Sequence, residues 1–321
     1  MSHLSKMKYI AIGMCMVLVS SLLVSCSVDG GASKTNKGNK ETKITGKSVK
    51  SQHLKKLKKL DYNSRCIHVY DLTSNTVIFD RNGGKRMPVT SLVKLMNCRK
   101  ALQIMSQKNI KLSDKIKLDA KVLKLTLKQG ETSSDYVQGE KLRYKDLLYA
   151  MMLRSDADSA KTIAIRLKGN AQNYVKEMNL EAKKLGLKDT EYVNVDGAKK
   201  KGQYSTARDV IRLLRIAMKD KKFYKIITTA SYRSGRTPQH PQGVKCSNTT
   251  VKRFKEYNNS KFKVIGGKYG YSRSVGRTVV VVAKKHKKIY LIVVMGNKHR
   301  KDKDKCTNES IGDVLKIMRN I

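Results

Sequence analysis

The stretch Pro88-Val89-Thr90-Ser91-Leu92-Val93-Lys94-Leu95-Met96 decides how this chain is interpreted. Its apolar residues continue at helical spacing to about residue 104, and they predict a helix that begins soon after Pro88. Residues three apart share one face of a helix, so Ser91 and Lys94 lie within reach of each other. A serine hydroxyl is a weak nucleophile unless a base lies beside it, and a lysine whose pKa is lowered by burial or by a second cation can be that base. The stretch therefore predicts Ser91 as a nucleophile and Lys94 as its proton acceptor.

Two later stretches carry residues that would complete such a site. Residues 147–160 have a helical pattern that contains Ser155 and Ala157. Gly266-Gly267-Lys268-Tyr269-Gly270-Tyr271 lies before a Val-rich strand pattern. Because Ser-x-x-Lys also occurs elsewhere in this lysine-rich chain, the interpretation depends on the order and combination of all three stretches.

The three stretches resemble the Ser-x-x-Lys, Ser-x-Asn and Lys-Thr-Gly elements of the D-Ala-D-Ala carboxypeptidases. These are the low-molecular-mass penicillin-binding proteins of the β-lactamase/DD-peptidase superfamily. Residues 175–197 and 202–209 also resemble a helix with its following loop and a Tyr-Ser-Thr-Ala helix start in that family, so the resemblance covers about residues 62–321. Two positions depart from the pattern: Ala157 stands in place of Asn, and Tyr269 in place of Thr. Each lost polar contact weakens the grip on substrate by roughly 1–3 kcal/mol if its partner stays unpaired, and a bulky Tyr269 narrows the site.

The resemblance implies acyl transfer on peptidoglycan stem peptides, with β-lactam antibiotics as covalent inhibitors. Ser91 would attack the carbonyl between the two D-Ala residues, Lys94 would accept the proton, and Ser155 would relay a proton to the leaving D-Ala. The backbone N–H groups of Ser91 and Tyr271 would form the oxyanion hole. The substrate-binding segment is then Lys268, whose charge faces the terminal carboxylate, with Gly270 and Tyr271. No metal or cofactor is needed.

The order of predicted elements defines the fold class. Strand patterns occur near both ends of the folded part, and helical patterns fill the middle. We therefore expect an α+β, DD-peptidase/β-lactamase-like fold, with one antiparallel sheet built from both chain ends, flanking helices and a helical subdomain inserted at about residues 108–220. A cleft between sheet and subdomain is the expected place for the site. The predicted strands are 66–70, 76–79, 276–283 and 289–295, and the predicted helices are 90–104, 144–167, 171–185, 207–218 and 310–318.

The first residues have the pattern of an export signal. Lys6 and Lys8 precede an apolar run over residues 9–24, which ends in Leu23-Val24-Ser25-Cys26. This matches a bacterial lipobox, so residues 1–25 are predicted to be a lipoprotein signal peptide and Cys26 the lipidated residue. Residues 26–60 are then a basic tether, and residues 61–321 a DD-peptidase-like domain without an extra C-terminal β-domain. The lipid would hold the protein at the extracytoplasmic face of the cell membrane.

Charge defines the expected partners rather than the fold. Lys and Arg number 69 against 25 Asp and Glu, a formal net charge of +44 at pH 7. An exported chain of this charge meets anionic lipids and the teichoic-type wall polymers of a Gram-positive cell instead of chromosomes. Since the basic residues show neither aromatic interleaving nor a base-reading motif, we expect no nucleic-acid partner.

Two alternatives on the same fold stay open from the sequence. The losses at Ala157 and Tyr269 are compatible with a non-catalytic lipoprotein that binds peptidoglycan or a wall polymer. A β-lactamase would need a carboxylate that activates the deacylating water, and Glu177 and Glu181 are the candidates. The sequence leaves the state of the thiols open, with buried free thiols favoured over one disulfide and no zinc-ligand spacing: Cys66, Cys98, Cys246 and Cys306.

Overall fold

The structure is a computed structural model. It describes residues 54–321 apart from 119–121, 124–131, 134, 199 and 260. The predicted signal peptide, Cys26 and most of the predicted tether therefore lie outside the described residues. No helix in the described part of the chain is both long enough and apolar enough to cross a membrane.

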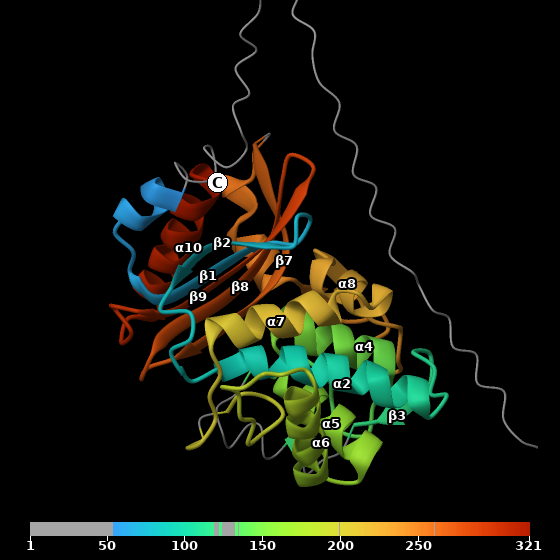
Figure 1. The fold of residues 1–321 in the computed structure, drawn as a ribbon. Coiled ribbons are helices and arrows are strands. Elements are labelled where there is room, and N and C mark those ends of the chain that lie inside the picture. The colour runs from blue at the N-terminus through green and yellow to red at the C-terminus, as the bar shows by residue number, and fades with distance from the viewer. Residues whose placement is uncertain (1–53, 119–121, 124–131, 134, 199, 260) are drawn as a thin grey trace, which may run out of the picture. The chain divides into compact units, whose positions relative to one another are not determined.

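The central element is a five-stranded sheet made from the two ends of the domain (Figure 1). All neighbouring strands are antiparallel. The first two strands come from the N-terminal side and the other three from the C-terminal side, which confirms the predicted α+β fold. In spatial order the strands are β2 (Thr76–Arg81), β1 (Ser64–Asp71), β9 (Lys288–Asn297), β8 (Gly276–Lys285) and β7 (Phe262–Ser272).

Helices cover both faces of this sheet, which explains why β8 and β9 are runs of buried Val, Ile and Leu instead of alternating patterns. On one face, α10 (Lys303–Arg319) and a short helix over residues 54–59 enclose one hydrophobic cluster (Figure 1). Leu57 is fully buried in that cluster, and its carbonyl accepts a hydrogen bond from the Tyr62 hydroxyl at 3.1 Å. The packed domain therefore starts before the expected boundary at residue 61.

The other face carries the helical layer and the larger hydrophobic cluster. The helical pattern predicted over residues 144–167 is interrupted at Ser155, whose φ of +68° is left-handed. Asp156 then caps the next helix by accepting a hydrogen bond from the Ser159 backbone N–H at 2.8 Å. The helices of this layer are α2 (Val93–Gln107), α4 (Tyr144–Tyr149), a π-helix (Ala150–Arg154), α5 (Ala157–Lys168), α6 (Ala171–Lys184), α7 (Ala207–Ala217) and α8 (Lys221–Thr228).

Several short elements beside the sheet were not predicted. Each has too few residues to show a hydrophobic period. They lie near the free edge of β7 and at the far end of the helical layer. They are the paired strands β3 (Lys115–Lys117) and β4 (Lys141–Arg143), the paired strands β5 (Ser231–Arg233) and β6 (Lys245–Ser247), α9 (Thr249–Arg253), and the 3₁₀ turns Thr90–Leu92 and Lys255–Tyr257.

Candidate active site

A cavity of about 570 Å³ brings together residues from the three motif stretches. It is bordered by the turn before α2, the break before α5, and strand β7. The residues predicted to carry the chemistry all line it: Ser91, Lys94, Ser155, Lys268, Gly270 and Tyr271. The folding of distant segments thus creates one site where the sequence offered three separate patterns.

Ser91 lies in a 3₁₀ turn held tightly between two backbone segments. Thr90, just before it, has a φ of +48°, an unfavourable value for a β-branched residue. A Cβ added at Gly197 would lie 2.3 Å from the Thr90 carbonyl oxygen, and one added at Gly270 would lie 2.0 Å from the Thr90 Oγ1. Only glycines permit this approach from both sides. The strained turn is therefore fixed by its surroundings, as strained backbone at functional sites commonly is.

Lys94 lies in the first turn of α2 and is only 2% exposed. Its Nζ donates a hydrogen bond to the backbone carbonyl of Asp196. Asn97, one turn further along the helix, donates from Nδ2 to the Val195 carbonyl at 2.9 Å. The loop that ends at Gly197 is thus fastened to α2 directly beneath Ser91.

A buried ion pair below Lys94 was missed by the sequence reasoning. The Lys161 Nζ lies 3.2 Å from the Asp196 Oδ2, and both side chains are almost inaccessible to solvent. Asp196 therefore contacts Lys94 through its backbone and Lys161 through its carboxylate. The available signal was the aspartate before Gly197 in the matched loop, but nothing in the sequence pointed to Lys161 as its partner.

Lys268 supplies a second buried amine to the same site. It is 3% exposed, and burial together with the nearby positive charge of Lys94 holds its pKa well below the usual lysine range. Two ammonium groups in one dry site repel each other, so the pair gives up a proton more readily than an exposed lysine does. A neutral amine close to Ser91 is what activation of the serine requires.

Ser155 reaches the cavity because the helix breaks there. The π-helix ends at Arg154, and the left-handed Ser155 directs the chain into α5. π-Helical turns are rare and occur often at functional sites. Ala157, two residues later, lines the cavity, and its backbone N–H donates to the Thr132 carbonyl at 2.9 Å. The cavity wall therefore carries a methyl group where an Asn would present an amide.

Tyr269 lies between Lys268 and Gly270 on β7, but its side chain belongs to the cluster on the α10 face of the sheet. Its cross-strand partner Val279 lies in the same cluster, whereas the partner of Lys268, Val280, faces the helical layer. The ring therefore packs mainly into the core instead of blocking the cavity. Two guanidinium groups flank it, with Cζ atoms 5.3 Å (Arg253) and 5.5 Å (Arg277) from its centroid.

Other nucleophiles and cation sites are unfavourable in the described structure. All four thiols are buried and free, and burial raises the pKa of Cys246 to about 11. A buried protonated thiol is a poor nucleophile. Within the described ranges, no group of three or more His, Cys, Asp or Glu side chains could hold a metal ion.

The carboxylates weighed for a β-lactamase lie in ion pairs instead of lining the cavity. The Glu181 carboxylate lies 2.7 Å from Arg99, and Glu177 lies 3.0 Å from Lys100. Both carboxylates thus stabilise the packing of α6 on α2, and neither is available to activate a water molecule beside Ser91.

A serine turn, a buried lysine pair and a cleft between sheet and helices define a serine acyl-transfer site of the DD-peptidase type. Residues 52–299 match the family model of the peptidase S11 D-alanyl-D-alanine carboxypeptidases, and the chain belongs to that family.

Individual relatives are distant. The chain is 25% identical over 175 residues to the D-alanyl-D-alanine carboxypeptidase DacF of Bacillus subtilis, and 24% identical over 165 residues to a D-alanyl-D-alanine carboxypeptidase of Streptomyces strain K15. These matches span 54% and 50% of this chain but only 44% and 56% of the relatives. The crystal structure of the Streptomyces K15 DD-transpeptidase superposes with a TM-score of 0.71 at 21% identity, covering 82% of this chain and 98% of that one.

Proposed function

We propose that this protein is a serine D-Ala-D-Ala carboxypeptidase that removes the terminal D-Ala from peptidoglycan stem peptides. The observation that carries the proposal is the convergence of Ser91, Lys94 and Lys268 in one cavity, with both lysines buried. Membership of the carboxypeptidase family supports the same reaction. β-Lactam antibiotics, which present an acyl group to the same serine, are the expected covalent inhibitors.

In the acylation step, the Ser91 Oγ forms a bond to the carbonyl carbon between the two D-Ala residues. The hydroxyl proton passes to the neutral Nζ of Lys94. Negative charge on the carbonyl oxygen is stabilised by the backbone N–H groups of Ser91 and Tyr271. The C–N bond then breaks, and the leaving amine takes a proton through the Ser155 hydroxyl.

Lys268 acts on substrate orientation and on the base. As a cation it attracts the terminal carboxylate of the substrate, and its charge favours the neutral form of the neighbouring Lys94. Water then attacks the acyl-enzyme, which releases the shortened peptide and restores the Ser91 hydroxyl. The cycle uses side chains and backbone of this chain alone.

Release of free D-Ala from an acetylated peptide that ends in D-Ala-D-Ala tests the reaction. We expect turnover by the wild type and none by Ser91→Ala, with unchanged circular dichroism. A non-catalytic wall-binding protein on the same fold is the second candidate, because the Ala157 methyl replaces a substrate-binding amide. A folded wild type that binds the peptide without releasing D-Ala would favour that second candidate.

We also propose that the protein is exported and lipidated at Cys26, which would hold it at the outer face of the cell membrane. The charged n-region, apolar run and lipobox support this proposal. Fractionation of cells that express Cys26→Ala tests it. We expect the wild type in the membrane fraction and the variant shifted to the soluble fraction or the medium, whereas equal membrane retention would contradict lipidation at this residue.

A further inference from the structure

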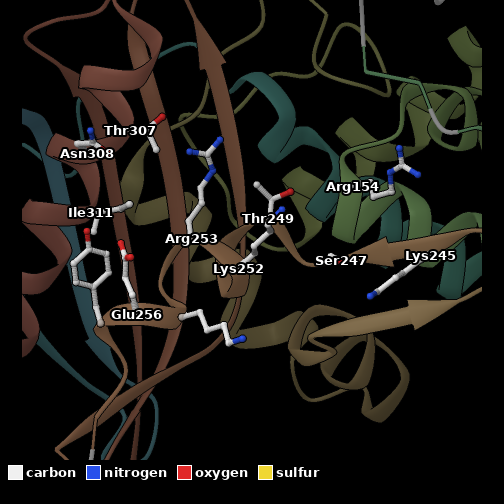
Figure 2. Close-up of a pocket in the computed structure, with 12 residues that line it drawn as sticks. Arg154, Lys245, Ser247, Thr249, Lys252, Arg253, Glu256, Thr307, Asn308 and Ile311 are labelled. Carbon is white, nitrogen blue, oxygen red and sulfur yellow. The ribbon is translucent and has the colours of Figure 1, made fainter.

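A second, larger cavity of about 930 Å³ adjoins the candidate active site. It lies beyond the free edge of β7, between α9 with β6 on one side and the first turns of α10 on the other. Figure 2 shows Arg253 in the middle, with Arg154 and Lys245 to one side and Thr307 and Asn308 to the other. We call this cavity the basic groove.

The basic groove carries a strong excess of positive charge. Arg154 is paired with Asp135 at 3.0 Å, but no described carboxylate lies within ion-pair distance of the other cations. The single acidic side chain on its wall is Glu256. Unpaired cations around a concave surface concentrate anions near it. The basic side chains are Arg154, Lys245, Lys252, Arg253 and Lys255.

The groove and the active-site cavity are continuous. Arg154, Thr249 and Arg253 line both of them. A chain with its reactive end at Ser91 can therefore extend directly into the groove. Arg253, with its guanidinium over the Tyr269 ring beside Lys268, lies at the junction.

We propose that the basic groove is an extended substrate subsite that binds side-chain or backbone carboxylates of an acidic stem peptide whose D-Ala end lies at Ser91. This inference rests on the proposed function. Continuity favours a peptide over a separate phosphate polymer, because the same molecule then uses both cavities. The Ser247 hydroxyl and the Asn308 amide also line the groove and can bind peptide groups between the charges. The subsite would replace part of the grip lost at Ala157.

Equilibrium binding separates this subsite from catalysis. We would use the Ser91→Ala protein, which binds peptide without turning it over, and fluorescence anisotropy of two labelled peptides. Both end in D-Ala-D-Ala, and only one carries an additional carboxylate from a D-glutamyl residue. The Lys245→Glu/Lys252→Glu/Lys255→Glu variant reverses the exposed cations of the groove. We expect about a tenfold rise in Kd for the acidic peptide, since each exposed ion pair contributes modestly, and less than a twofold change for the neutral one.

A matched control reverses three exposed lysines elsewhere on the domain, Lys219→Glu/Lys222→Glu/Lys287→Glu. It has the same net charge, so a similar loss of acidic-peptide binding would indicate a general charge effect and overturn the subsite. An unchanged Kd in the groove variant would also overturn it, as would loss of poly(glycerol phosphate) binding alone. If neither peptide binds Ser91→Ala, the proposed function itself fails. Binding of both peptides without discrimination by the groove variant removes only the subsite.

Discussion

The floor of the active-site cavity and its rim differ in how their groups are held. The floor consists of Lys94, Lys161, Asp196 and Lys268, all buried and fixed by strand, helix and loop. The rim consists of Ala157, Tyr269 and the basic groove, whose lysines are exposed. The groups that move protons thus lie where the geometry is most constrained.

The departures from the family pattern fall on the rim. A buried amine acts through its altered pKa and position, and few substitutions can replace it. Substrate grip is a sum of several contacts, so a methyl at residue 157 can be offset by charge elsewhere. The comparison predicts that changes in the floor affect the chemistry or the fold steeply, and that changes in the rim adjust affinity by modest factors.

Removal of the proton acceptor should have the largest effect. Lys94→Ala is expected to lower the rate of acylation by about 10²–10⁴-fold, the range of a positioned general base. Stopped-flow measurement with a fluorescent penicillin gives the rate. Lys108→Ala at the exposed end of the same helix region is the control and should react like the wild type. Equal rates for Lys94→Ala and wild type would remove Lys94 from the mechanism.

The buried ion pair gives the next largest effect. Lys161→Met leaves the Asp196 carboxylate buried without this cation and is expected to lower the free energy of unfolding by about 3 kcal/mol. Urea denaturation measures the loss. Lys161→Met/Asp196→Asn removes both charges and should recover most of it, while acylation at Ser91 slows in the single variant. No recovery in the double variant would mean that packing, rather than charge, explains the loss.

The depressed pKa of Lys268 makes stability depend on pH. The unfolded chain binds a proton at this lysine up to its ordinary pKa near 10.5, whereas the folded chain releases it at lower pH. The free energy of unfolding of the wild type therefore rises with pH between the two pKa values, by up to about 1.4 kcal/mol per pH unit. Lys268→Met lacks this contribution.

Urea denaturation at pH 7 and pH 9 compares the two proteins. The difference in unfolding free energy, wild type minus Lys268→Met, should increase by about 1–2 kcal/mol over this interval. A difference that is constant or that falls with pH would show that Lys268 stays protonated in the fold.

Restoring the amide at the rim should have the smallest effect. Ala157→Asn places a polar group on the cavity wall and is expected to raise kcat/KM on a neutral D-Ala-D-Ala peptide by about tenfold, the value of one hydrogen bond to substrate. The gain should be smaller on an acidic peptide if the basic groove already holds it. A loss of activity on both peptides would mean that Ala157 is required by the packing of this cavity.

The sequence predicts the parts of this molecule that depend on local spacing. The Val-rich strands and the Ser91–Lys94 spacing each express a short-range pattern, so sheet, helix and nucleophile were predicted directly. The Lys161–Asp196 pair joins α5 to a distant loop, and only packing reveals it. The left-handed Ser155 and the basic groove were also beyond prediction, because a serine gives no signal for positive φ and the groove combines short elements without periodicity.

Covalent trapping tests the central claim most directly. The domain from residue 54 onward would be incubated with a labelled penicillin, digested, and analysed by mass spectrometry beside Ser91→Ala. We expect one acyl adduct, located on the peptide that contains Ser91 and absent from the variant. A folded wild type without any adduct at saturating probe, or an adduct that persists in Ser91→Ala, would contradict a serine acyl-transfer mechanism at this site.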